Sequence, residues 1–239
     1  MVKSKVIIMS TLKIMEREDQ VKLNNKTITF AGHEIDLLPS ASLFLKEYGV
    51  LVVSDLHLEK PFSFMDRSFC SLEEKTQDTL KSLEALAARF QPKKIIILGD
   101  LFHDEHSFDR ISLDKMDRLY NFFKSYKIIW VDGHHRDGFS PPDIDMRMEY
   151  AYLNLNFRHL ATDKEDFEIS GNYSPAVKID NEGSSGILKC FVCDKTKFLM
   201  PSFNCNVDTM NIKDPVIQTL FSSRQKVYPI QDRCVFKLS

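Results

Sequence analysis

The stretch VLVVSDLH, residues 50–57, decides the fold, because an apolar run ends there in a polar cluster. Consecutive apolar residues of this kind are typical of a β-strand that is buried on both faces. The cluster places a carboxylate, Asp55, two positions before an imidazole, His57. We therefore expect a strand of a parallel sheet whose carboxyl end carries polar groups able to do chemistry.

The same arrangement recurs twice downstream. The two further apolar runs and the polar residues after them are 94–98 with Gly99-Asp100, and 128–131 with DGHH at 132–135. Between the three strands, apolar residues at helical spacing predict helices over 71–90 and from about residue 112. Strands that alternate with helices are the signature of parallel βαβ units, so the sequence predicts an α/β fold.

The flanks of this α/β region are expected to be rich in strands. Residues 1–48 predict a peripheral N-terminal β-rich segment, and residues 206–239 a C-terminal extension. The sequence GSSG at 183–186 predicts a hairpin turn. The strands expected here are 27–30, 187–192 and 197–200. No stretch with the composition of a linker indicates a domain boundary, so we expect a single domain over residues 1–239.

Composition narrows the class of protein. Of the 239 residues, 43% are hydrophobic and 28% are charged, which is ordinary for a globular chain with a sizeable core. The net charge of -2 gives no general attraction to nucleic acid or to an anionic membrane. No apolar run approaches the roughly 18 residues of a membrane span, and the run at 6–9 is too short for a signal peptide. We expect a cytoplasmic protein that has no membrane partner.

The cysteines do not form a recognisable site. Five cysteines scattered over a long chain argue against a disulfide framework, because the number is odd. Cys190 and Cys193 have C-x-x-C spacing, but no second pair or nearby histidine completes a zinc site. Phe191 and Val192 between them favour a buried strand instead.

The polar groups after the three strands suit a metal site. The carboxyl ends of neighbouring parallel strands meet at one edge of a sheet, where open α/β sheets bind their ligands. Asp55, His57, Asp100, His134 and His135 could therefore converge. Carboxylates and imidazoles together suit Mn, Fe or Zn, and two metals about 3.5–4 Å apart can clamp a phosphoryl group and activate a water. The residues thus indicate metal-dependent phosphoryl chemistry.

In this order the motifs resemble those of the calcineurin-like metallophosphoesterases, in particular the branch of ligase-associated DNA damage response endonucleases. DLHLEK at 55–60 is similar to the D-L-H-L-G-K of that branch, and LGDLFH at 98–103 to its L-G-D-L-x-H. GNYSPA at 171–176 stands in the place of G-H-x-H-P-A. The resemblance covers residues 26–205 and implies a four-layer αββα sandwich with two mixed β-sheets and the metals at their seam.

The resemblance also implies a role for each site residue. Asp55 and His57 would bind a first metal, and Asp100 would bridge it to a second. His159 would match the lone histidine ligand that precedes the last motif. His135 would be the catalytic histidine that stabilises the transition state and protonates the leaving oxygen.

Four positions depart from the family's pattern. His134 replaces an asparagine ligand. An imidazole can bind the same metals, but its nitrogen lies at a different distance from the backbone than an amide oxygen does. Asn172 replaces the first histidine of the last motif, and Ser174 replaces the second with a hydroxyl, which is a poor ligand. Arg136 stands where the family has an acidic residue, and it would oppose a metal or contact a phosphate. We expect one or two metals, with His134 and Asn172 as unusual ligands.

The sequence leaves two classes of function open. As an enzyme, the chain would hydrolyse phosphomonoester or phosphodiester bonds by a metal-activated hydroxide, using manganese, or iron or zinc in its place. The resemblance implies nucleic acid or nucleotides as substrates and a DNA ligase as a partner. Otherwise the chain would be a catalytically impaired binding or scaffolding module, or a phosphate sensor that does not cleave.

Other polar residues have ordinary explanations. His103 and His106 lie among acidic residues, but we expect loop residues there, with His103 supporting a metal ligand. Arg224, Lys226 and Arg233 predict a solvated face rather than a nucleic-acid groove. The site residues have such alternatives too: the aspartates could cap loops, and the histidines could be packed or exposed.

Overall fold

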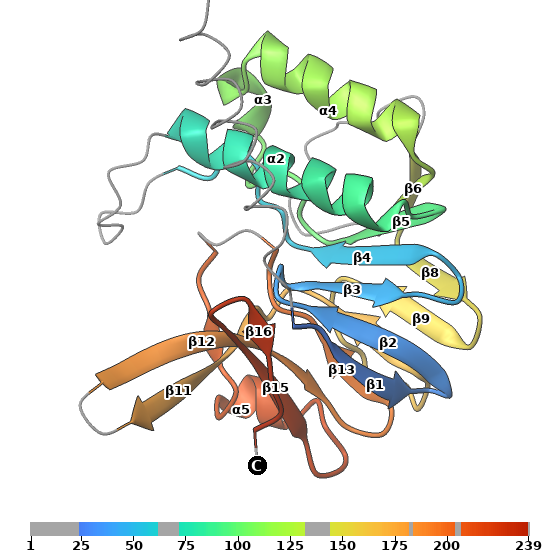
Figure 1. Ribbon diagram of the computed structural model, residues 1–239, viewed down its shortest axis with the longest axis vertical. Helices are drawn as coiled ribbons and strands as arrows, with labels where there is room; N and C mark the ends of the chain where they lie inside the picture. The colour runs from blue at the N-terminus through green and yellow to red at the C-terminus, as the bar shows by residue number, and fades with distance from the viewer. Residues whose placement is uncertain (1–23, 62–71, 132–143, 182–183, 204–206, 239) are drawn as a thin grey trace, which may run out of the picture.

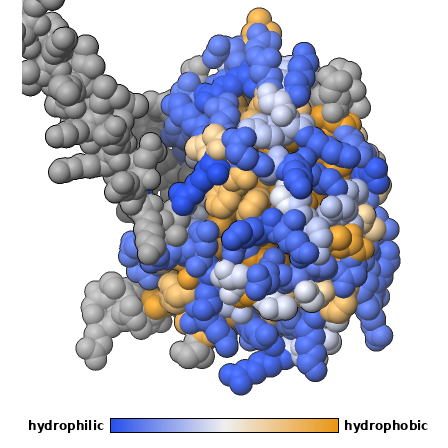
Figure 2. All heavy atoms as spheres, turned by 45° about the vertical axis from the view of Figure 1, so that its right-hand side comes forward, coloured by the Kyte–Doolittle hydropathy of each residue, from blue (hydrophilic) through white to orange (hydrophobic). Residues whose placement is uncertain are grey.

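The computed structural model describes residues 24–61, 72–131, 144–181, 184–203 and 207–238. Two β-sheets lie against each other, and helices cover the outer face of the first sheet (Figure 1). The face shown in Figure 2 is largely hydrophilic, and its apolar side chains gather in small patches. Among the described helices, none is long and apolar enough to span a membrane.

The first sheet contains the three strands that the apolar runs predict. Its order is β1-β2-β3-β4-β5-β6-β7, antiparallel from β1 to β4 and parallel from β4 to β7. The predicted strands are β4, β5 and β6, and all their residues are buried because helices cover one face and the second sheet covers the other. The bounds are β1 Lys26–Phe30, β2 His33–Leu38, β3 Ser42–Leu45, β4 Val50–Ser54, β5 Lys94–Leu98, β6 Ile128–Val131 and β7 Asp145–Arg147.

Helices α2 and α4 form the layer over the first sheet (Figure 1). They are α2, Leu72–Phe90, and α4, Leu113–Ser125, as the helical spacing predicts, and the short α3, Ser107–Arg110, precedes α4. One side of each helix packs on the sheet, which stabilises helices of this length more than their intrinsic propensity does. The buried apolar residues in this cluster are Leu80, Leu83, Leu86 and Ala87 of α2, and Leu119, Phe122 and Phe123 of α4.

The second sheet is mixed as well. Strand β10 is parallel to β9 and β13, whereas β11 and β12 form a long antiparallel hairpin. The order is β14-β11-β12-β13-β10-β9-β8, and β15 pairs with both β12 and β16. The bounds are β8 Glu149–Tyr152, β9 Leu155–Arg158, β10 Glu168–Ser170, β11 Pro175–Asn181, β12 Ser184–Cys193, β13 Lys197–Leu199, β14 Met210–Asn211, β15 Lys226–Gln231 and β16 Cys234–Val235.

A short helix covers the outer face of the second sheet. This is α5, Pro215–Gln218, whose Ile217 packs in one cluster with Val177 of β11 and with Cys190 and Val192 of β12. The expected four-layer αββα sandwich with two mixed sheets is confirmed. In the described part of the chain its fourth layer is reduced to this one helix.

The core between the sheets draws on the N-terminal segment as well as on the α/β region. Ile35 of β2 and Leu43 of β3 have no exposed surface, and they belong to one cluster with Phe191 of β12 and Phe198 of β13. Strands β1 to β3 therefore extend the first sheet, and β2 and β3 help to fill the core between the sheets, whereas β1 is the edge strand and is largely exposed. In the same way, β15 extends the second sheet by pairing with β12.

Two local expectations concern β12. The prediction of a turn at GSSG is wrong for Ser184 and Gly186, because both belong to β12 and pair with β11. Continuing the ladder gives their backbone groups partners that a turn would leave to water. The expected buried strand is confirmed for Cys190 and Cys193, which lie in clusters on opposite faces of the sheet. Burial raises the pKa of Cys193 to about 12, so its thiol is inert at neutral pH.

A buried ion pair ties the loop after β4 to the helical layer. Glu59 in that loop is 1% exposed, and its carboxylate lies 2.9 Å from Nζ of Lys115 in α4. Arg110 of α3 donates two hydrogen bonds to the Glu59 carbonyl. The φ angle of Glu59 is 59°, in the left-handed region that favours glycine. Charge pairing thus holds this loop at a position where the backbone is strained.

Lys115→Ala should destabilise the protein by about 3–5 kcal/mol, because it leaves the Glu59 carboxylate buried without its charged partner. Adding Glu59→Gly should recover most of that loss, since it removes the charge and suits the left-handed backbone. Urea unfolding of the two variants measures both effects. Equal stability of the single and double variants would contradict the role given to the ion pair.

Candidate metal centre

Backbone hydrogen bonds hold the loops after β4 and β5 side by side. The Asp55 N–H donates to the Leu98 carbonyl at 2.9 Å, and the His57 N–H donates to the Asp100 carbonyl at 3.0 Å. The two parallel strands end in register, with Ser54 opposite Leu98. Asp55, His57 and Asp100 therefore lie together at the carboxyl edge of the first sheet.

His159 reaches the same place from the second sheet. It follows β9, and its Nε2 lies 3.1 Å from Oδ1 of Asp55. Ligand atoms of Asp55, Asp100 and His159 all lie within 4.8 Å of one another, and the three residues are buried. His57 adds its Nε2 at 3.7 Å from Oδ2 of Asp100. The structure thus brings these four predicted ligands together at the seam between the sheets.

This set of donors fits a divalent metal. Two carboxylates and two imidazoles at one buried place suit Mn, Fe or Zn. The ring of His57 also meets that of His103, with their Nδ1 atoms 3.2 Å apart, so that one ring donates to the other. A partner that orients a ligand histidine and fixes its tautomer is typical of metal sites. His103 therefore lies where it can support a ligand, whereas the side chain of His106 is 68% exposed.

Two glycines make room for these groups. Gly99 has a φ angle of 82°, and a Cβ atom there would lie 2.6 Å from Nε2 of His159. A Cβ atom at Gly171 would lie 3.0 Å from Oδ2 of Asp55. Both positions require glycine because backbone from each sheet approaches the site closely.

Several other residues of the site have left-handed backbones. The φ angle is 50° at Asp55, 41° at His57, 66° at Asn172 and 39° at Ser174. Such conformations cost about 1–2 kcal/mol each and persist where the surrounding structure over-determines them. Their concentration in the first and last motifs is what a functional site would show.

Burial and neighbouring charges set the protonation of two of these residues. Burial is the largest influence on Asp55 and acts to raise its pKa, but hydrogen bonds from His159 and Ser54 outweigh it and hold the pKa below its usual value. For His57, burial outweighs the attraction of Asp55 and Asp100 and lowers the pKa to about 4. At neutral pH Asp55 is a carboxylate and His57 a neutral imidazole, the forms that bind metals.

The last motif approaches Asp55 through its backbone. The Asn172 N–H donates to Oδ2 of Asp55 at 2.9 Å, and the Ser54 hydroxyl donates to the same oxygen. Ser174 is 1% exposed, and its Oγ has no hydrogen-bond partner among the described residues. The Asn172 side chain remains a predicted ligand, and a buried hydroxyl occupies the place where the similar family has an imidazole.

Two serines that hold Asp55 were missed by sequence reasoning. Ser54 donates to its carboxylate, and Oγ of Ser202 donates to its carbonyl at 2.9 Å. The Phe203 N–H donates to the Ser54 carbonyl at 2.7 Å, which fixes the same segment. No local pattern marks Ser202, because its partner is 147 residues away in the chain.

The third motif, with His134, His135 and Arg136, lies outside the described residues. Strand β6, which precedes it, ends in register with β5, and the Gly99 N–H donates to the Val131 carbonyl at 2.8 Å. The third strand therefore ends at the same edge as the other two. The roles of His134 and His135 stay predictions.

Comparison with known proteins agrees with this geometry. A family model described as calcineurin-like phosphoesterase matches residues 48–205. The chain belongs to the calcineurin-like phosphoesterase family. All the predicted ligands of this calcineurin-like phosphoesterase lie within the matched range.

The fold of this family member is also found in a solved structure, the crystal structure of Pseudomonas putida nuclease MPE. The TM-score is 0.70 and the sequence identity 20%, over 90% of this chain and 100% of that chain. At that identity the likeness shows a shared fold. A search of the curated proteins found no match.

The metal-free phosphoesterase should lose stability as the pH falls from about 6.5 to about 4. His57 in the unfolded chain takes up a proton near its usual pKa of about 6.5, whereas folded His57 does so only near its pKa of about 4. Because the unfolded state binds more protons over this range, stability falls with pH, by at most about 3 kcal/mol for this residue. Urea unfolding in the presence of a chelator, at pH 7 and pH 4.5, measures the loss.

His57→Gln should flatten this pH dependence, because it removes the group that titrates. His106→Gln is the matched control, since its side chain is 68% exposed, and it should leave the dependence unchanged. An identical pH dependence in all three proteins would show that His57 is not held neutral by burial.

Proposed function

We propose that this chain is a metal-dependent phosphoesterase that hydrolyses phosphodiester or phosphomonoester bonds. The observation that carries the proposal is the buried cluster of Asp55, Asp100 and His159, whose ligand atoms lie within 4.8 Å of one another. Carboxylates buried so close together repel each other as anions, and a divalent cation between them would remove that repulsion. Membership of the calcineurin-like phosphoesterase family supports phosphoester chemistry at this cluster.

The metal ligands would come from both sheets. The proposed set is Asp55, His57, Asp100, His134, His159 and Asn172. Manganese is the metal we expect, with iron or zinc as alternatives, and with one or two ions for each chain. When bound, such an ion supplies a Lewis acid that polarises a phosphoryl oxygen and lowers the pKa of water.

Other groups of the chain would orient these ligands. The Ser54 hydroxyl and the Asn172 N–H both donate to Oδ2 of Asp55, so that Oδ1 is the oxygen directed toward His159. His103 would fix the ring of His57 in one orientation. His135 is proposed to stabilise the transition state and to protonate the leaving oxygen.

Nucleic acid or a nucleotide is the substrate class that we favour. The similar solved structure is that of a nuclease, which supports a phosphodiester of a nucleotide chain as the group to be cleaved. A role in DNA repair, a DNA ligase as partner and a cytoplasmic location are supported only by the resemblance of the motifs.

A catalytically impaired binding or scaffolding module is the second candidate. Ser174 favours it, because a buried hydroxyl replaces an imidazole at a metal-binding position of the similar family. Without that nitrogen, the site would bind one of two metal ions less tightly. A single metal can still activate a water, but it cannot clamp a phosphoryl group from two sides.

Hydrolysis of bis-p-nitrophenyl phosphate with added manganese tests the proposal. Asp100→Asn should lower kcat by more than the roughly 10–100-fold that loss of an outer partner of a metal ligand costs, because Asp100 would bind the metal itself. Asp109→Asn is the matched control, since it makes the same change at an aspartate of α3 whose side chain is 82% exposed. It should keep the activity of the unchanged protein.

Full activity of the Asp100→Asn variant would show that the site is wrongly assigned. Absence of turnover by the unchanged protein with manganese, iron and zinc would favour the binding module. Thermal unfolding of each variant shows whether a loss of activity reflects the site or the fold.

A further inference from the structure

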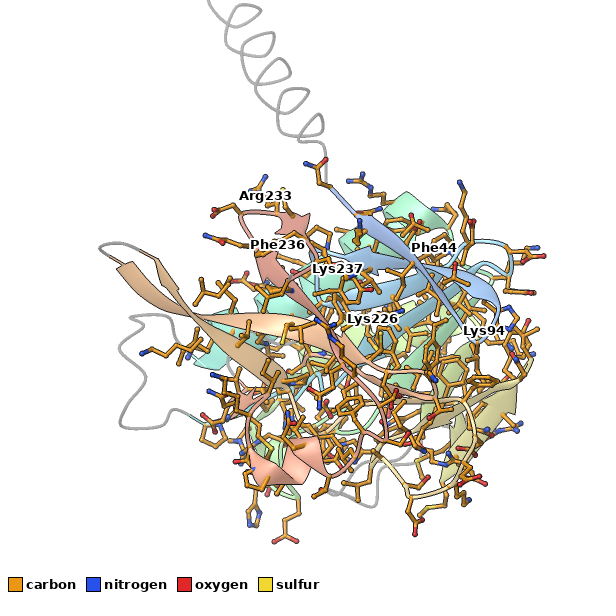
Figure 3. All side chains as sticks on the ribbon, turned by 90° about the horizontal axis from the view of Figure 1, so that it is seen from below. Phe44, Lys94, Lys226, Arg233, Phe236 and Lys237 are labelled. Carbon is orange, nitrogen blue, oxygen red and sulfur yellow. The ribbon has the colours of Figure 1, made fainter. Side chains whose placement is uncertain are left out.

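The β11–β12 hairpin begins at the candidate metal centre and runs outward from it. Strand β11 starts at Pro175, directly after Ser174. The hairpin reaches past the end of β4 in Figure 1, and it also projects from the body of the molecule in Figure 3. A ribbon that starts at a phosphoryl site is well placed to hold the part of a substrate that lies beyond the reacting group.

The register of the hairpin shows which residues face the metal centre. Opposed residues of an antiparallel pair share a face, and Val177 with Leu188 lie on the face that packs toward α5. Lys178 and Ile187 form the next pair and lie on the other face, as does Lys189. Further along β12 this inner face packs in the core between the sheets. Past the first sheet it carries an exposed Lys178 and an Ile187 that is 69% exposed.

Two hydrogen bonds connect this inner face to the metal centre. Nζ of Lys189 donates to the Ser202 carbonyl at 2.9 Å. The Ser202 hydroxyl donates in turn to the Asp55 carbonyl at 2.9 Å. The inner face of the hairpin is therefore continuous with the wall of the site.

We propose that the exposed part of this inner face, Lys178 and Ile187, holds the strand of a polynucleotide that leads away from the scissile phosphate. Lys178 would contact a backbone phosphate, and Ile187 would pack against a base or sugar. This inference rests on the proposed function and narrows its substrate to a chain of nucleotides instead of a small phosphoester.

Distance and charge favour this occupant. Lys178 is four residues along β11 from Ser174, which is about 13 Å at the rise of a strand. Successive phosphates lie about 3.4 Å apart along the axis of one strand of a DNA duplex and farther apart in an extended single strand, so this length exceeds one nucleotide step. A mononucleotide in the metal centre would not reach Lys178, whereas an oligonucleotide would. Because the whole chain has a net charge of -2, attraction of a polyanion has to come from local cations such as Lys178.

The inner face of the hairpin lies apart from a second cluster of basic residues. This cluster consists of Lys226 and Arg233 of the β15–β16 hairpin and of Lys237, which follows β16 (Figure 3). Lys226 pairs with Cys193 at the end of β12 away from the site. Lys237 is exposed, and so are Arg224, Lys226 and Arg233, for which a solvated face is expected. None of these cations is part of the proposed binding face.

Binding of a 5′-fluorescein-labelled, 20-nucleotide single-stranded DNA to the full chain tests the inference. Anisotropy is measured in the presence of a chelator, so that no cleavage occurs. Lys178→Ala with Ile187→Ser should raise the Kd at least tenfold. It should also reduce the slope of log Kd against log salt by about 0.7, the value for one lost phosphate contact on a single strand.

The matched control is Lys213→Ala with Val216→Ser, which removes one exposed lysine and one exposed apolar side chain near α5 on the outer side of the second sheet. It should bind within twofold of the unchanged protein. Equal affinity of the hairpin and control variants, or no binding of the DNA by the unchanged protein, would overturn the inference.

Catalysis separates this inference from the proposed function. In an active protein, the hairpin variant should lower the ratio of kcat/KM for the oligonucleotide to kcat/KM for bis-p-nitrophenyl phosphate at least tenfold. An unchanged ratio would count against the hairpin as a substrate-binding face. If the unchanged protein cleaves neither substrate, the proposed function fails, and the binding comparison alone decides the inference.

Discussion

The buried carboxylate of Asp55 joins the two sheets, and the arrangement of the site depends on it. It accepts hydrogen bonds from the Ser54 hydroxyl and the Asn172 N–H, and it lies 3.1 Å from Nε2 of His159. A buried charge is costly unless it is paired and hydrogen-bonded, so the sheets have to meet where these donors reach it. The same requirement explains why Gly99 and Gly171 leave space beside it. Strained backbone in the motif loops is tolerated because these contacts hold it in place.

Local sequence patterns predict those parts of the fold that local forces determine. The apolar runs that became β4, β5 and β6 were recognisable because strands buried on both faces contain few polar residues. Their order along the chain brought Asp55 and Asp100 to one edge. His159 could be named only through the resemblance to a family, since it arrives from the second sheet. Ser202 was out of reach, because its contact with Asp55 spans 147 residues. The start of β12 at Ser184 depends on pairing with β11, which overrides the turn propensity of a glycine-serine stretch.

The positions at which the motifs differ from those of the similar branch lie around the candidate metal centre. Glu59 stands where the similar branch has glycine, and it is anchored by Lys115 at 2.9 Å in spite of its left-handed backbone. Asn172 contacts Asp55 through its N–H, and Ser174 brings a buried hydroxyl in place of an imidazole. Three residues that the resemblance matches to metal ligands, Asp55, Asp100 and His159, do meet at the seam. The cluster of Asp55, Asp100 and His159 can therefore hold one metal ion, as we propose.

A crystal structure of the protein soaked with manganese, with anomalous diffraction recorded at the manganese edge, tests the central claim most directly. We expect an anomalous peak at the seam, from a manganese ion bonded to Asp100 and to at least two of Asp55, His57 and His159. Such a peak would establish the cluster as a metal centre, and the number of peaks would show whether the altered last motif still supports a second ion. An ordered seam with no peak at a saturating concentration of manganese would contradict the account.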